Sequence, residues 1–543
     1  MSQATNRLFR SKNAHAPIIV ALVVIGIQIA LFEWDIKKLF SDGPVDDAFY
    51  YFKISENVSH SFSLTFDQLN ITNGFHPLWL LLLLPLSRLF SGDNLVIAIY
   101  VFQIFLIAAS AALAVQIIQL VGKERNKLLL YLPVFVIPLY FTFRLRLLNG
   151  LEQPIQILVF MVTVLAFNRY RHSSKPLDGL ILGTMLSLCF LARTDSIIFV
   201  LLLIGYLIAF KVGSTRFRFT TIAVTSFTIL CFTVANYIIF GSPVQVSGAT
   251  KSVWATYELH LDSSSMHLPA FILRLLNIFW PLRGNVFEVS SYGDRSAAIL
   301  LLIAIIGFAH AKIRNRPELV LLNSYLIIKY LYYALSYDDA IWYYGIDLFV
   351  ASITTVLILI EAGYKNLGKY LVRPFVVGSM LFLLIMGVLD FSNNERVFQD
   401  PPRLEEKLKA SSLSLNEFKF PSSVIVGMSD AGIFGYYSRY RVVNLDGLVN
   451  GAERLRMTKQ YVYNVFPYLD IHPEIEVYVV AAAWDGYSKL RVNAAEHGFE
   501  EVFLQKCFEK SLSDSDPSDW GGVMAMFVRK TSVLQTDCPV SGG

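Results

Sequence analysis

The chain has 543 residues, of which 55% are hydrophobic and 16% are charged, whereas about 25% of the residues of a soluble domain are charged. Apolar runs recur from residue 17 to about 390. This composition excludes a soluble globular protein and predicts a polytopic α-helical membrane protein. The net charge is +4; we expect the lipid bilayer as a partner, and no nucleic acid. The four cysteines are too few for a disulfide framework.

The first apolar run covers residues 17–34, behind a polar, basic N-terminus and without a small-residue cleavage site, so it is interpreted as an uncleaved membrane helix. A long loop, 35–93, follows. Its apolar run at 77–90 has only about 13 residues, a length that favours an interfacial or re-entrant helix over a crossing. Further crossings are expected at 94–121, 127–147, 151–168, 177–193, 195–211, 218–240, 297–312, 317–336, 341–361 and 372–390.

The distribution of basic residues supports this count. With the N-terminus inside and 77–90 not crossing, six inner segments each carry three Lys or Arg residues, for example Lys123, Arg125 and Lys127. The positive-inside rule therefore predicts about eleven crossings in the cell membrane, with the N-terminus cytoplasmic and the C-terminal tail extracytoplasmic.

The tail differs in character from the rest. Short β-branched runs precede glycine-containing turns in "SSVIVGMSDAG" and "RYRVVNLDG", and "EIEVYVVAAAW" and "GGVMAMFVRK" indicate further strands. The sequence thus predicts two domains: a transmembrane domain over 1–390, including the loop 35–93, and a soluble α/β domain over 391–543.

Two adjacent acids, Asp46 and Asp47, open the stretch "DDAFYYFKISENV" in the first outer loop. Adjacent carboxylates point in different directions, so one is available for acid–base chemistry while the other anchors the loop or binds a cation. The simpler alternative is that both cap an interfacial helix.

Other polar residues collect on the same predicted side. His76 in "TNGFHPLW" precedes the short apolar run, and Glu152 in "NGLEQP" lies at the outer end of a membrane helix. Arg193 and Asp195 in "ARTD" lie between two helices, where they either pair with each other or meet a ligand; an Arg there suits a lipid phosphate. Lys251 lies in the outer loop 241–296, where a solvated surface residue is the default interpretation.

Taken together, "DDAFYYFKISENV", "TNGFHPLW", "NGLEQP" and "ARTD" resemble the pattern of the GT-C glycosyltransferases. The stretch "WYYG" (342–345) and the tail's "VVNLDGLVNG" are similar to bacterial and archaeal members with a C-terminal periplasmic domain. The resemblance implies a GT-C-like fold and Asp46 and Asp47 as catalytic residues, with Asp46, the first acid of the motif, as base. It implies substrate binding by His76, Glu152, Arg193 and Asp195. Lys251, a basic residue of the second outer loop, is a second candidate after Arg193 for binding the donor phosphate. An Asp-Asp pair replaces the family's Asp-x-Asp spacing, and the sequence does not separate the roles of the two acids.

The expected function is inverting transfer of a sugar from a polyprenyl-phosphate-linked donor to a glycan, lipid or protein acceptor on the extracytoplasmic face. Such a reaction needs a carboxylate base and positive charge at the departing phosphate, supplied by basic residues or by a divalent cation, Mg²⁺ or Mn²⁺, for which Asp47 is the candidate ligand. A glycolipid transporter or flippase, or a non-catalytic envelope assembly protein, remains the alternative. Transporters place ionisable residues near the midplane, often in repeated halves, and no repeat is visible here.

Overall fold

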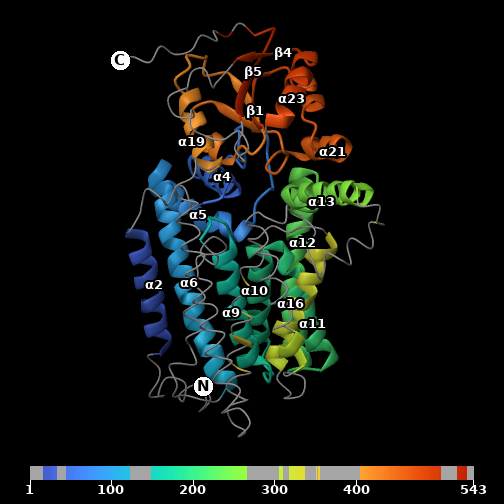
Figure 1. Ribbon diagram of the computed structural model, residues 1–543. Coiled ribbons are helices and arrows are strands. Elements are labelled where there is room, and N and C mark those ends of the chain that lie inside the picture. The colour runs from blue at the N-terminus through green and yellow to red at the C-terminus, as the bar shows by residue number, and fades with distance from the viewer. Residues whose placement is uncertain are drawn as a thin grey trace.

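The computed structural model describes residues 16–33, 44–122, 148–265, 305–309, 317–336, 404–482, 484–502 and 523–532, with a few isolated positions elsewhere. Within these residues, a bundle of long helices carries an α/β domain at one end (Figure 1). The predicted crossings 127–147 and 372–390 lie outside the described residues, as do most of 297–312 and 341–361. The number of eleven crossings therefore stays a prediction.

Seven helices of the bundle coincide with predicted crossings. They are α2 (Ala16–Glu33), α6 (Gly92–Gly122), α9 (Gln153–Tyr170), α10 (Pro176–Ala192), α11 (Ile197–Ala209), α12 (Thr215–Phe240) and α16 (Pro317–Ser336). Among the described residues, α6 and α12 are both long and apolar enough to cross a membrane, and α10 and α11 are shorter apolar helices. Large apolar side chains lie exposed along α12, as a lipid-facing helix requires: Phe219, Phe227, Leu230, Val234, Ile238 and Ile239.

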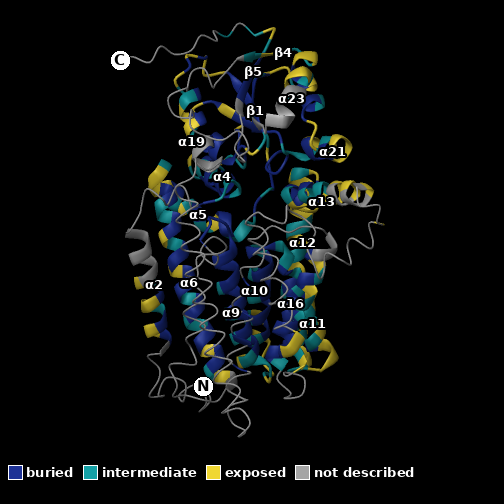
Figure 2. Cartoon of the chain, viewed as in Figure 1, coloured by how far each residue is buried: buried dark blue, intermediate teal, exposed yellow. Residues whose placement is uncertain are grey.

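The bundle has an apolar core with close helix contacts. Figure 2 shows buried positions along α6, α9 and α10. Where α10 meets α12, the hydroxyls of Thr221 and Thr225 donate to the carbonyls of Gly179 and Gly183 at 3.1 and 3.2 Å. Small residues that let two backbones approach, with hydroxyls bonding across the gap, are typical of helix packing in membranes.

The two loops predicted to lie outside form helices of their own at the end of the bundle nearest the α/β domain (Figure 1). The first loop contains α4 (Asp46–Ser61) and α5 (Pro77–Leu89), the latter 13 residues long and opened by Pro77. The short apolar run is thus a helix of less than membrane-spanning length, as expected. The second loop, which the sequence presents only as a long loop, begins with α13 (Val246–Ser265).

The C-terminal domain is a five-stranded sheet with the order β2-β1-β3-β5-β4. Strands β1 (Ile425–Met428), β2 (Arg441–Asn444) and β3 (Ile475–Ala482) are parallel, whereas β5 (Val523–Arg529) runs antiparallel to β3 and to β4 (Phe499–Val502). Its helices are α19 (Leu404–Leu415), α20 (Gly432–Tyr437), α21 (Ala452–Tyr461), α22 (Phe466–Ile471) and α23 (Trp484–Glu496). Four of the five strands were expected; β4, at an edge of the sheet, was not. The domain boundary at residue 390 stays a prediction.

The α/β domain is joined to the first outer loop by a shared apolar core. Phe49 and Phe52 of α4 pack edge-on against the ring of Tyr436 in α20, and the same buried cluster continues into β1 and β3. Because this core is continuous across the junction, the loops that follow β1 and β2 are fixed against α4. These loops leave the carboxyl ends of parallel strands, the edge at which α/β sheets usually present functional groups.

Candidate active site

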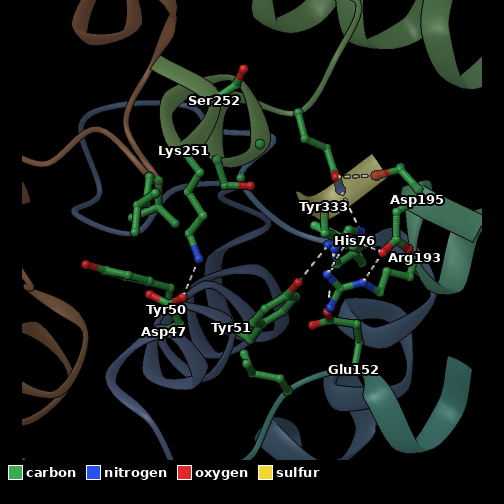
Figure 3. A pocket seen from close by; sticks show the side chains of 18 of the residues that line it. Asp47, Tyr50, Tyr51, His76, Glu152, Arg193, Asp195, Lys251, Ser252 and Tyr333 are labelled. Atoms are coloured by element: carbon green, nitrogen blue, oxygen red, sulfur yellow. Dashed lines mark hydrogen bonds and ion pairs between the residues drawn. The ribbon is translucent and has the colours of Figure 1, made fainter. Parts of the chain in front are cut away.

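A cavity of about 330 Å³ lies at the junction of the bundle and the α/β domain. Its walls come from α4, the residues before α5 and α9, the 3₁₀ turn η2 (Thr194–Ser196), α13, the end of α16 and the loop after β2. Segments from the whole chain therefore meet here. Six of the seven predicted site residues line it, namely Asp47, His76, Glu152, Arg193, Asp195 and Lys251. Figure 3 shows Asp47 and Lys251 on one side and the Glu152–Arg193 group on the other.

Asp47 and Lys251 form an ion pair inside the cavity. The Nζ atom of Lys251, on α13, donates to Oδ2 of Asp47, in the first turn of α4, at 2.8 Å. The Asp47 side chain is 25% exposed and that of Lys251 is 22% exposed. Both charged groups can therefore be reached by a ligand in the cavity. Lys251, by sequence an ordinary solvated residue, is thus part of the site.

Asp46 does not line the cavity. Its Oδ2 accepts the backbone N–H of Gly432 at 3.0 Å, and its Oδ1 accepts that of Ile433 at 2.7 Å. Burial raises the pKa of Asp46, although these two donors favour the ionised form. Neither acid caps α4, whose N-cap is Val45 without a side-chain hydrogen bond. Asp46 instead accepts the first N–H groups of a helix in the other domain, so the structure lends no support to its proposed role as base.

Arg193 is the centre of a buried charged cluster. Its Nη1 donates to Oε1 of Glu152 at 2.7 Å, its Nε to Oδ2 of Asp195 at 2.9 Å, and its Nη2 to the hydroxyl of Tyr333 at 3.4 Å. The Tyr333 hydroxyl in turn donates to Asp195. Exposure of the Arg193, Glu152 and Asp195 side chains is 6, 4 and 12%. Arg193 and Asp195 thus pair with each other, and Glu152 completes the group; ligand binding by Arg193 stays a prediction.

The turn that presents Glu152 is held by buried hydrogen bonds from two helices. Trp79 of α5 donates through Nε1 to the carbonyl of Gly150 at 3.1 Å. Gln103 of α6 donates to the carbonyl of Leu151 at 2.6 Å and accepts the N–H of Gly150 at 3.1 Å. Unpaired backbone groups are costly in such surroundings, so these contacts fix the Glu152 side chain at the rim of the bundle.

His76 is held as a neutral ring. Gln245 donates through Nε2 to the carbonyl of Phe75 and to Nδ1 of His76, the latter at 3.1 Å. Nδ1 is therefore the acceptor, and the ring proton lies on Nε2, which is 3.6 Å from Oε1 of Glu152. Burial lowers the pKa of His76, against the opposing effect of Glu152. His76 thus carries an N–H rather than a charge toward the Glu152 carboxylate near neutral pH.

The α/β domain contributes directly to this region. The hydroxyl of Tyr50 in α4 donates to Oδ2 of Asp446 at 3.1 Å and accepts from the N–H of Ala431 and from Nδ2 of Asn444 at 3.1 and 2.8 Å. Leu448, in the same loop as Asp446, lines the cavity. The domain is therefore part of the cavity wall.

The sequence did not single out several of these residues. Tyr50 lies three positions after Asp47, a spacing that places two side chains on neighbouring parts of one helix face, and this signal was available. Gln245 and Tyr333 carry no local signal, because their partners lie 169 and 138 residues away in the chain.

The donor set of the cavity does not fit a divalent cation. No three His, Cys, Asp or Glu side chains of the described residues come together in a way that holds a metal ion. The carboxylates of Asp47 and Glu152 are each already paired with a basic side chain. The hypothesis that Asp47 binds Mg²⁺ or Mn²⁺ finds no support in this arrangement.

The chain combines a helix bundle, a short helix in the first predicted outer loop and an α/β domain over a cavity of acids and bases. Comparison with solved structures finds a similar fold. The crystal structure of the Archaeoglobus fulgidus oligosaccharyltransferase tethered with an acceptor peptide aligns over 91% of this chain and 73% of that chain, with a TM-score of 0.51 and 14% sequence identity. At that identity the likeness shows the fold.

Two further Archaeoglobus fulgidus structures align over 90% of this chain and 72% of each of those chains. One is the oligosaccharyltransferase AglB in complex with an inhibitory peptide and a dolichol-phosphate, with a TM-score of 0.49 and 14% identity. The other is an oligosaccharyltransferase complex with Zn and sulfate, with a TM-score of 0.46 and 15% identity. No protein-family model matches the chain, and no curated protein matches its sequence.

Proposed function

We propose that this protein is an inverting membrane glycosyltransferase that moves a sugar from a polyprenyl-phosphate-linked donor to a glycan, lipid or protein acceptor on the extracytoplasmic face. One observation carries the proposal. A carboxylate and an ammonium group, Asp47 and Lys251, lie together in a cavity at the end of the bundle that carries the α/β domain. The oligosaccharyltransferase fold supports the same reaction class.

Asp47 is the best candidate for the base. Among the acids that line the cavity, its side chain is 25% exposed, against 4% for Glu152 and 12% for Asp195. A base must come within hydrogen-bond reach of the acceptor hydroxyl, and Asp47 meets this condition best. In the reaction the acceptor oxygen attacks the anomeric carbon, the bond from that carbon to the phosphate oxygen breaks, and Asp47 takes the hydroxyl proton.

The Arg193 cluster is assigned a positioning role. Its guanidinium is held by two carboxylates and a tyrosine hydroxyl, so it fixes the shape and charge of the cavity floor. Glu152 and the N–H of His76 face the cavity from this cluster, in a position suited to hydrogen bonds with sugar hydroxyls. The location of the cavity at one end of the bundle, against the α/β domain, favours the enzyme over a transporter, whose ionisable residues line a path through the membrane.

Mass spectrometry of purified protein incubated with a set of polyprenyl-phosphate sugars and a membrane extract as acceptor source tests the proposal. We expect transfer by the wild type and at least a hundredfold loss in Asp47→Asn, in line with the usual contribution of a general base of about 10²–10⁴. Asp470→Asn is the matched control, because Asp470 is an exposed acid of α22, outside the cavity lining. Full activity of the Asp47→Asn variant would remove the assignment.

A further inference from the structure

The cavity has an unusual balance of charge for a site of phosphate-linked chemistry. Its acidic side chains are Asp47, Glu152 and Asp195, and its basic ones are Lys251 and Arg193. Each acid is within an ion-pair distance of one of these two cations. A lipid phosphate that enters this cavity brings further negative charge, so a cation must be made available to it.

Lys251 and Arg193 differ in how readily they can change partner. The Arg193 side chain is 6% exposed, and its planar group bridges two carboxylates, so removing it would leave two buried charges without their partner. Lys251 is 22% exposed on α13. Its ammonium is a point charge on a flexible four-carbon stem and donates in any direction. Movement of Lys251 leaves the partly exposed carboxylate of Asp47, which the cavity can solvate, and takes a favourable positive charge away from Asp430.

We infer that Lys251 exchanges partners during the reaction, leaving Asp47 for the phosphate of the lipid-linked donor and supplying there the positive charge that a divalent cation would otherwise provide. This inference rests on the proposed function and deepens it. It also explains why the cavity lacks a metal-binding group among its described residues. A divalent cation at Asp47 would have to displace an ammonium already bonded at 2.8 Å and would then be repelled by it.

The exchange couples donor binding to activation of the base. While Lys251 donates to Oδ2 of Asp47, the ammonium occupies the side of that carboxylate that faces the cavity. Once the ammonium has moved to the phosphate, this oxygen can accept the hydrogen bond of the acceptor hydroxyl. As the bond between the anomeric carbon and the phosphate oxygen breaks, the electron pair stays on the departing phosphate, whose charge Lys251 balances, and the acceptor proton goes to Asp47.

Binding of farnesyl phosphate, a soluble prenyl phosphate, to the detergent-purified full chain tests this inference by calorimetry. After treatment with EDTA and dialysis, the wild-type Kd should change less than twofold. Lys251→Gln should weaken binding at least tenfold, whereas Lys251→Arg, which keeps the charge, should stay within about fivefold of wild type; a shift of 1.4 kcal/mol corresponds to tenfold. Lys459→Gln on α21, an exposed lysine outside the cavity lining, should have no effect. Farnesol should not distinguish any of the variants.

The Asp47→Asn variant separates partner exchange from a static ion pair. If Asp47 competes with the phosphate for Lys251, removing its charge should tighten farnesyl phosphate binding at least threefold. If Asp47→Asn binds farnesyl phosphate as the wild type does, or more weakly, the exchange is overturned. The same holds if the wild type does not bind it, if chelation abolishes binding, or if Lys251→Gln binds normally. Because these are binding measurements, a failure to detect sugar transfer would count against the proposed function alone.

Discussion

The role assigned to Asp46 leads to a test at the junction of the two domains. Gly432 packs so closely on Asp46 that a Cβ atom there would lie 2.1 Å from the Asp46 carbonyl oxygen. Contacts under 3.0 Å force the backbone to move. Asp46→Ala and Gly432→Ala therefore disturb the same contact from opposite sides, and only the first removes the carboxylate.

The size of the effect follows from the two hydrogen bonds at 3.0 and 2.7 Å. In Asp46→Ala the N–H groups of Gly432 and Ile433 lose their acceptor. A buried polar group left unpaired costs about 1–3 kcal/mol, so the docking of α20 should weaken by about 2–6 kcal/mol. At 1.4 kcal/mol per factor of ten, the smaller value corresponds to roughly a 30-fold increase in local opening.

Hydrogen exchange over α20, read by mass spectrometry, measures this opening. We expect faster exchange in Asp46→Ala and in Gly432→Ala, and the effects should not add in the double variant because both act on one contact. Transfer activity should fall in parallel, since the same junction orients α4. The control is Gly451→Ala, where the added Cβ meets only the Ile71 carbonyl oxygen at 3.6 Å, an ordinary contact.

The opposite result would be that Asp46→Asn abolishes transfer while exchange over α20 stays at the wild-type rate and Gly432→Ala is fully active. That result would return Asp46 to the role of base. A parallel loss of docking and activity in both single variants would instead establish Asp46 as a positioning residue.

Three further predictions concern the rest of the site and its location. Folding lowers the pKa of His76 from its usual 6.5, so the unfolded chain takes up a proton first as the pH falls. The Tm of the wild type should therefore drop more between pH 7 and 5 than the Tm of His76→Gln. An equal change in Tm with pH for the two proteins would contradict this prediction. Arg193→Lys should lower stability by about 3–5 kcal/mol in denaturant titrations, since a point charge cannot replace a planar group that bridges two buried carboxylates; a wild-type midpoint would show that the cluster tolerates it. Cysteines introduced in place of Leu69 and Ser422, both exposed, should react with an impermeant maleimide in intact cells, whereas a cysteine in place of Ser174 should not. If only one of the first two is labelled, the first loop and the tail do not both lie on the extracytoplasmic side.

The general layout could be predicted from sequence because its signals are local. Apolar runs and basic clusters indicated the helices. Runs before glycine turns indicated two strands, and two further runs indicated two more. Six of the seven proposed site residues line one cavity. They could be selected from the sequence because an ionisable residue at the end of an apolar helix is costly unless it meets a partner.

Which of the two acids, Asp46 or Asp47, contacts α20 and which one faces the cavity could not be predicted in the same way. It depends on the first turn of α20, which lies almost 390 residues further along the chain. No window of sequence around "DDAF" contains the backbone donors that hold Asp46. The pairing of Lys251 with Asp47 spans 204 residues and was equally hidden, so Lys251 had the sequence pattern of a surface residue.

Helix geometry explains why an adjacent pair of acids suits this junction. Successive side chains of an α-helix are rotated by about 100°, with a rise of about 1.5 Å, so neighbours in one turn face different surroundings at nearly the same height. At the start of α4 one acid faces α20 and the next faces the cavity. With an Asp-x-Asp spacing, the two carboxylates would differ by about 200° in rotation about the helix axis. One of them would then face neither α20 nor the cavity. The adjacent pair places the contact that docks the α/β domain one residue from the carboxylate proposed to take the proton, so the position of the domain and the orientation of the base depend on the same turn of helix.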